Sequence, residues 1–152
     1  MAELTAPYAV LDTNLLIRLL ISPHGITSRL LTALEERAYH LVTSEPLMEE
    51  FRVVLGYPRL QRFGPFSEQD IQRLTGGVRR LALVVPGRYT DLDKVPTDWK
   101  DNIVVACALE AGADFIVSDD RRDLLPLKVI RCAGFRAVQI VRPMAFLRLL
   151  GR

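Results

Sequence analysis

The sequence predicts an α/β fold in which a parallel sheet is covered by helices on both faces. Short, almost wholly apolar strand segments alternate along the chain with longer segments whose apolar residues recur at helical spacing. Continuous apolar strands are typical of parallel sheets that are buried on both faces, and strand–helix alternation is the pattern of such sheets. A length of 152 residues, with 49% hydrophobic and 25% charged residues, predicts a single domain over residues 1–152.

The first half of the chain supplies two strand–helix units and one additional helix. The run "NLLIRLLIS" places its leucines at helical spacing until Pro23 and Gly25 interrupt it, and Ser44 is a good residue to cap a helix. The predicted elements, in order, are a strand at 8–11, helices at 14–22 and 27–37, a strand at 39–44 and a helix at 45–55.

The second half continues the same alternation. Ser67 and Asp70 have the spacing of a capping box, and Gly112 is a suitable residue to follow the end of a helix. The predicted elements are a helix from 67 to about 80, a strand at 81–85, a long loop at 87–100, a helix at 101–111, strands at 114–117 and 137–141, and a helix at 143–150.

Composition excludes several classes of protein. The net charge of +2 permits a nucleic-acid partner without arguing for one. Cys107 and Cys132 are far from each other and from both histidines, which argues against zinc, and Cys107 fits a small buried thiol. No segment approaches the ~20 apolar residues of a membrane span, and no signal sequence is evident, so we expect a cytoplasmic protein without membrane contact.

Acidic residues stand at strand ends and in the early turns of helices. The carboxyl ends of parallel strands meet at one edge of a sheet, so these side chains are expected to converge there. Clustered carboxylates repel one another unless divalent cations compensate, and oxygen ligands suit Mg²⁺ or Mn²⁺. The candidates are Asp12, Glu50 or Glu49, Asp101, and Asp120 or Asp119.

Each acidic residue also has an ordinary structural interpretation. Asp12 can cap a helix, Asp101 can interact with a helix dipole, and the pair Glu49–Glu50 can form a solvated helix face. Taken singly, these interpretations equal or exceed the functional one. It is the combination of these acids with their neighbouring sequence that favours a metal site.

Four sequence blocks carry a resemblance to a known family. They are "VLDTN", "SEPLMEEF", "DWKDNIVVACALEAGADFIVSDDRRDLLPL" and "AVQIVRPMAFLRLL", which together cover nearly the whole chain. In this order they resemble the PIN-domain ribonucleases, in particular the toxins of toxin–antitoxin pairs. The resemblance implies a three-layer α/β/α fold with a central parallel sheet, and Mg²⁺- or Mn²⁺-dependent cleavage of RNA. It also implies a small antitoxin partner and a homodimer.

The resemblance assigns roles to individual positions. Glu50 matches better than Glu49, because it directly precedes an apolar residue. Asp120 matches the pattern of a small hydroxyl residue, any residue and aspartate, although Asp119 adds a second acid and the following segment is one residue longer than the family pattern. The implied catalytic metal ligands are Asp12, Glu50, Asp101 and Asp120, and Asn14 is implied to support Asp12.

Further candidates could contact substrate. Ser118 could orient a water or a phosphate, or simply cap the turn that follows it. Arg121 and Arg122 could hold RNA phosphates near the acids, or form an ordinary solvated pair. The arginines of "YPRLQRF" and the pair Arg79–Arg80 have the same two interpretations, with the ordinary surface role favoured.

Two other functions compete with the nuclease. A catalytically inactive PIN fold could serve as an RNA- or protein-binding module. A phosphatase of the haloacid-dehalogenase type, with Asp12 as nucleophile, is disfavoured because Asn14 stands where its second aspartate is expected. A dinucleotide-binding fold is disfavoured because no Gly-x-Gly-x-x-Gly follows the first strand.

Overall fold

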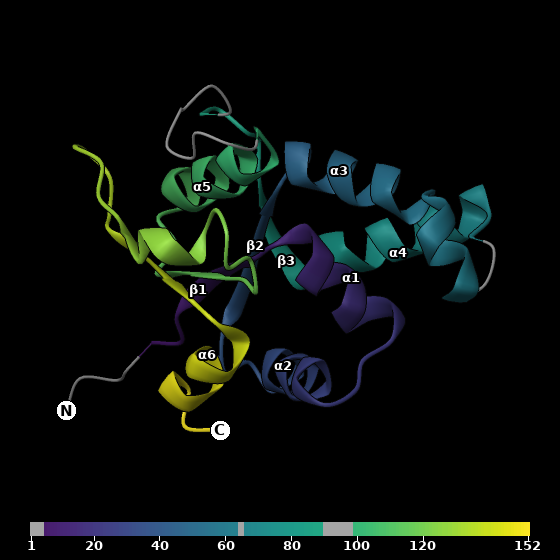
Figure 1. Ribbon diagram of the computed structural model, residues 1–152, viewed down its shortest axis with the longest axis horizontal. Helices are drawn as coiled ribbons and strands as arrows, with labels where there is room; N and C mark the ends of the chain where they lie inside the picture. The colour runs from purple at the N-terminus through teal and green to yellow at the C-terminus, as the bar shows by residue number, and fades with distance from the viewer. Residues whose placement is uncertain (1–4, 64–65, 90–98) are drawn as a thin grey trace.

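The computed structural model describes residues 5–63, 66–89 and 99–152, with the side chains of 61 and 99–102 outside that description. Strands and helices alternate along the chain as the sequence predicts (Figure 1). The elements are β1 (Tyr8–Leu11), α1 (Thr13–Ile21), α2 (Ile26–Glu35), β2 (His40–Ser44), α3 (Glu45–Leu55), the 3₁₀ helix η1 (Pro58–Phe63), α4 (Glu68–Leu81), β3 (Ala82–Val85), α5 (Trp99–Ala111), β4 (Phe115–Val117), the 3₁₀ helix η2 (Leu125–Leu127), β5 (Val129–Ile130), β6 (Val138–Val141) and α6 (Pro143–Leu149).

A six-stranded sheet in the order β3-β2-β1-β4-β6-β5 forms the centre of the fold. All neighbouring strands are parallel except β5, which runs antiparallel to β6 at one edge. The parallel sheet is therefore confirmed, and the antiparallel edge strand is an addition to the prediction. With only two residues, β5 is too short to show the periodicity from which strands are predicted.

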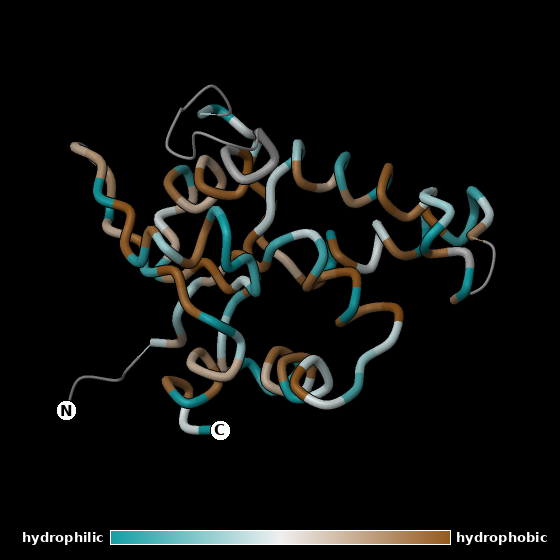
Figure 2. The backbone as a smooth tube through the Cα atoms, viewed as in Figure 1, coloured by the Kyte–Doolittle hydropathy of each residue, from teal (hydrophilic) through white to brown (hydrophobic). Residues whose placement is uncertain are grey.

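Helices cover both faces of this sheet, as Figure 1 shows. Ala9 and Leu11 of β1 pack in an apolar cluster with α1, α2, α3, α4 and α6, whereas Val10 between them packs in a second cluster with α5. Successive side chains of a strand point to opposite faces, so this separation follows from the strand geometry. In Figure 2, apolar residues run along the strands and along the helix sides toward them. The three-layer α/β/α architecture is thus confirmed.

Side-chain caps begin several helices where the sequence predicts them. The Ser44 hydroxyl accepts from the backbone N–H of Leu47 at 3.3 Å and caps α3. Ser67 and Asp70 form the predicted capping box, with each side chain accepting from the other residue's backbone N–H. These bonds satisfy N–H groups that have no partner within the helix.

Some element boundaries differ from the prediction. Helix α2 ends at Glu35 rather than at Arg37, which has φ +60° and so cannot continue a right-handed helix. Helix α5 already begins at Trp99, whereas most of the predicted loop before it, residues 90–98, lies outside the described part of the chain. None of the helices in the described part is long and apolar enough to cross a membrane.

Candidate active site at the carboxyl edge of the sheet

Asp12 and Ser118 each follow directly after a strand at the centre of the sheet. Strands β1 and β4 are neighbours, and Leu11 pairs with Val117. The backbone N–H of Asp12 donates to the Val117 carbonyl at 3.2 Å, while the N–H of Ser118 donates to Val141 of β6 at 3.0 Å. The sheet register therefore places both side chains side by side at its carboxyl edge.

The Asp12 carboxylate makes two different hydrogen bonds. Its Oδ1 accepts from the backbone N–H of Leu15 at 2.8 Å and caps α1, and its Oδ2 accepts from the Ser118 hydroxyl. Burial raises the pKa of Asp12 above its ordinary value, against the lowering effect of these two bonds; nearby Asp119 raises it and Arg18 lowers it. The side chain is thus a helix cap and, at the same time, a largely desolvated carboxylate at the sheet edge.

Ser118 connects Asp12 to the turn that follows β4. Its side chain is fully buried. The hydroxyl oxygen accepts from the backbone N–H of Asp120 at 2.9 Å, and the hydroxyl group donates its hydrogen bond to Asp12. The Oδ1 of Asp120 in turn accepts from the N–H groups of Arg122 and Asp123, each at 3.0 Å. The bond from Asp120 agrees with the turn-capping interpretation of Ser118, and the bond to Asp12 is an addition to the prediction.

The two adjacent acids of this turn have different partners. Asp119 pairs with Arg18 of α1 at 2.7 Å, and both side chains are 53% exposed. Asp120 is half-buried and lies within the hydrogen-bonded turn that follows Ser118. Asp119 therefore reaches toward α1, whereas Asp120 is tied directly to the residue that contacts Asp12.

The adjacent glutamates of α3 also differ. Glu49 is exposed and forms two hydrogen bonds with Arg52, at 2.7 and 3.1 Å, which lower the pKa of its carboxyl. Glu50 is half-buried, and its Oε2 is shielded from solvent. Leu47, one turn earlier on the same side of the helix, packs in the cluster with α5. These environments agree with the preference for Glu50 that the sequence gives.

Asp101 lies in the first turn of α5, and its side chain is outside the described residues. Helix α5 packs against β1, β2 and β4 and also against α3. Among the side chains that the structure describes, no group of three His, Cys, Asp or Glu residues could hold a metal ion. The three proposed ligands with described side chains, Asp12, Glu50 and Asp120, therefore do not form such a group by themselves.

The supporting residues that the sequence predicts lie on helix α1 and in the turn after β4. Asn14 is exposed on α1, one turn before Arg18, and both residues line a pocket beside the acids. Arg121 and Arg122 are exposed in the turn after β4. Arg18 was not among the predicted residues, although its spacing of four from Asn14 places both on one face of the helix and would have been a usable signal.

Two other sequence candidates have structural roles. Cys107 is buried, and burial raises the pKa of its thiol to about 12, against the lowering effect of a hydrogen bond with Ser44. This confirms the interpretation as a small buried thiol. Arg79 forms two hydrogen bonds with Glu45, both at 2.7 Å, so its guanidinium is engaged between α4 and α3.

Comparisons with known proteins agree with this architecture. Comparison with curated proteins finds no match. A solved structure described as FitAB bound to an IR36 DNA fragment superposes with a TM-score of 0.50 at 17% sequence identity, covering 89% of this chain and 94% of that chain. At such low identity the likeness concerns the fold alone. A family model of the PIN domain matches residues 8–122. Because that match spans well over half of the sequence, the chain belongs to the PIN-domain family.

Proposed function

We propose that this chain is a metal-dependent endoribonuclease that hydrolyses RNA phosphodiester bonds. The observation that carries the proposal is the desolvated Asp12 carboxylate at the carboxyl edge of the sheet, bonded by the buried Ser118 hydroxyl. PIN domains are generally nucleases, and they generally use divalent metal ions. The proposed ligands are Asp12, Glu50, Asp101 and Asp120, with Mg²⁺ or Mn²⁺ as the metal.

The residues fit a hard divalent cation in their chemistry. The proposed ligands are all carboxylates, and a partly buried carboxylate such as Asp12, whose pKa is raised by desolvation, gains from a nearby cation. Asp119 is the less suitable of the two adjacent acids, since its carboxylate already pairs with Arg18. When bound, the cation would activate a water molecule and stabilise the leaving oxygen of the phosphodiester.

The protein's own side chains hold the reacting groups in place. Ser118 donates to Asp12 and fixes the carboxylate orientation. Asp120 is kept near this edge by its backbone bond to the same hydroxyl. Asn14, Arg121 and Arg122 are exposed beside the acids and are proposed to contact substrate phosphates.

The biological setting is proposed from the sequence resemblance. We propose that the chain acts as the toxin of a toxin–antitoxin pair, with a small antitoxin as inhibitory partner, as a homodimer and in the cytoplasm. Residues 129–149, beyond the PIN match, add β5, β6 and α6 to the same sheet and its covering layer. This continuity supports treating residues 1–152 as a single nuclease domain.

The test is cleavage of a labelled, mixed-sequence RNA in Mg²⁺, in Mn²⁺ and in EDTA, beside a DNA of the same sequence. Asp12→Asn removes the charge but keeps an oxygen that can cap α1. Asp114→Asn is the matched control, because Asp114 lies at the opposite, amino end of the sheet and accepts there from the N–H of Tyr8 at 2.9 Å.

The proposal predicts metal-dependent cutting of RNA by the wild type and Asp114→Asn, with no cutting by Asp12→Asn or in EDTA. Equal cleavage by both variants, with both folded, would assign the activity to a contaminant or another site. RNA binding without turnover in any metal would instead favour the inactive binding module. Asp101→Asn, run in parallel, tests the ligand whose side chain lies outside the described residues.

A further inference from the structure

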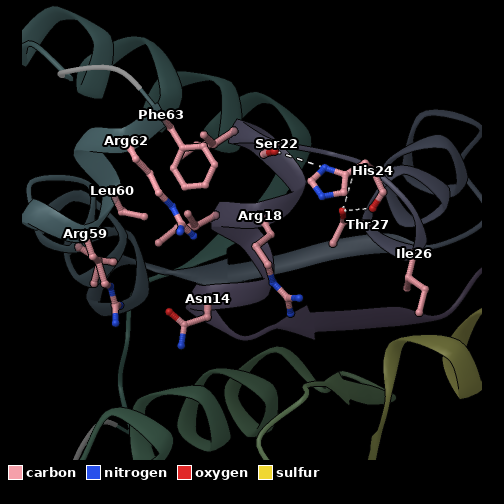
Figure 3. A pocket seen from close by; sticks show the side chains of 13 residues that line it. Asn14, Arg18, Ser22, His24, Ile26, Thr27, Arg59, Leu60, Arg62 and Phe63 are labelled. Atoms are coloured by element: carbon pink, nitrogen blue, oxygen red, sulfur yellow. Dashed lines mark hydrogen bonds between the residues drawn. The ribbon is translucent and has the colours of Figure 1, made fainter.

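A pocket of about 660 Å³ opens beside the acidic edge, and Asn14 is the one residue of its lining that the nuclease site described above also uses. Its walls are formed by helix α1, the segment after it, the first two residues of α2, one residue of α3 and the 3₁₀ helix η1 (Figure 3). Its floor is apolar and includes Ile17, Ile21 and Leu60.

The charge of the pocket favours an anionic ligand. Arg18, Arg59 and Arg62 line it, and none of the described residues that line it is acidic. In Figure 3 the side chains of Arg18 and Arg62 extend toward the same end of the pocket, where Asn14 lies. Several guanidinium groups that face one cavity suit a ligand with repeated negative charges, such as a phosphate backbone.

Aromatic rings and guanidinium groups are paired on the η1 side of the pocket. The guanidinium of Arg62 lies 4.8 Å from the centre of the Phe63 ring, and that of Arg59 lies 5.5 Å from the centre of the Tyr57 ring. Phe63 is 41% exposed, although it is a large apolar side chain. Exposed aromatic rings next to arginines are surfaces on which unpaired bases stack.

The pocket is connected to the acidic edge through α1. Arg18 lines the pocket and its guanidinium contacts Asp119 at 2.7 Å, so a single side chain joins the two regions. Asn14 also lines the pocket and lies only two residues after Asp12. A strand that occupies the pocket would therefore continue directly to the proposed metal ligands.

We propose that this pocket binds single-stranded RNA on one side of the scissile phosphate. Arg18, Arg59 and Arg62 contact backbone phosphates, and Phe63 stacks on a base. The assignment of RNA as the ligand rests on the proposed nuclease function. The pocket adds to that function a subsite that selects unpaired strands. Duplex RNA can use the arginines but cannot offer a free base face to Phe63.

The test measures RNA binding separately from cleavage. Fluorescence anisotropy of a labelled single-stranded RNA is recorded in EDTA with the Asp12→Asn protein, into which Arg59→Gln and Arg62→Gln are introduced together. Loss of two phosphate contacts should reduce the magnitude of the negative slope of log K (the association constant) against log salt concentration by about 1.4. It should also weaken binding about 10- to 30-fold at 0.1 M salt. Phe63→Ala should weaken single-strand binding about tenfold and leave duplex binding unchanged.

The matched control is Arg131→Gln with Arg136→Gln, which changes the net charge equally. These arginines line a separate cavity with Asp114 and Phe115, at the amino end of β4. The control should retain both affinity and salt slope. Unchanged binding by the Arg59/Arg62 variant would overturn the RNA assignment even if the protein cleaves RNA, and would leave the pocket as a docking surface for a peptide. Lost binding in a protein that never cleaves would support the subsite and refute the nuclease.

Discussion

The hydroxyl of Ser118 donates a hydrogen bond to Oδ2 of Asp12, across a sequence separation of 106 residues. This bond joins the ends of the neighbouring strands β1 and β4 and fixes the orientation of the carboxylate on which the proposed chemistry depends. Partners that orient a metal ligand in this way typically contribute 10- to 100-fold to metal affinity or activity.

Replacing Ser118 by alanine should therefore weaken metal use. We expect Ser118→Ala to require about 10- to 100-fold more Mn²⁺ for half-maximal RNA cleavage, because Asp12 loses the donor that orients it. A metal titration of the cleavage rate measures this directly. An unchanged titration curve would show that the bond serves only the turn after β4.

Ser67→Ala provides the control for this substitution. Ser67 caps α4 within the capping box, in a different part of the fold from the acids. Its loss should lower the free energy of unfolding by about 1 kcal/mol and leave the metal titration unchanged. Urea denaturation measures the loss of stability, and the same cleavage assay measures the metal requirement. If Ser67→Ala also changed the metal requirement, general destabilisation would explain both results.

The adjacent glutamates of α3 offer a matched pair of variants. Glu50→Gln should abolish cleavage, since Glu50 is the half-buried carboxylate proposed as a ligand. Glu49→Gln should retain the wild-type rate, because Glu49 is exposed and hydrogen-bonded to Arg52. Initial cleavage rates in Mn²⁺, compared after both variants show wild-type circular dichroism, decide the assignment. The reverse order of activities would make Glu49 the ligand.

The acids after β4 can be separated in the same way. Asp120→Asn keeps an oxygen to accept the N–H groups of Arg122 and Asp123, so the turn should persist while the charge is lost. We expect this variant to lose cleavage, and Asp119→Asn to retain it, because Asp119 only pairs with Arg18 at the surface. If Asp119→Asn alone were inactive, the additional acid of this sequence would be the ligand.

The two thiols should differ in reactivity. Burial raises the pKa of Cys107 to about 12, so at pH 8 this thiol stays protonated as well as inaccessible, and the thiolate is the reactive form. Cys132 is partly exposed. A thiol reagent should therefore modify one cysteine in the native protein and both in denaturant, as peptide mass spectrometry will show. Rapid labelling of Cys107 in the native state would contradict its burial between α5 and the sheet.

Much of the architecture is encoded locally and was therefore predictable. Apolar runs such as that of β1 are typical of strands in a buried parallel sheet. The capping box at Ser67 depends on residues three positions apart, and the φ of +64° at Gly112 is a conformation that glycine adopts easily. Such signals span only a few residues. Strand β5 gave no signal, since it is held in place by its pairing with β6.

The sequence by itself determined that Asp12 and the pair Asp119–Asp120 would stand at strand ends, because each follows an apolar run. The sequence could not determine how the surroundings of two adjacent acids differ, either for the pair Glu49–Glu50 or for the pair Asp119–Asp120. The pairing of Asp119 with Arg18, the burial of Glu50 and the double role of Ser118 depend on contacts between segments far apart in the chain. Only the register of β1 against β4 and the packing of α1 beside the sheet edge bring those segments together, and with them the arginine-lined pocket.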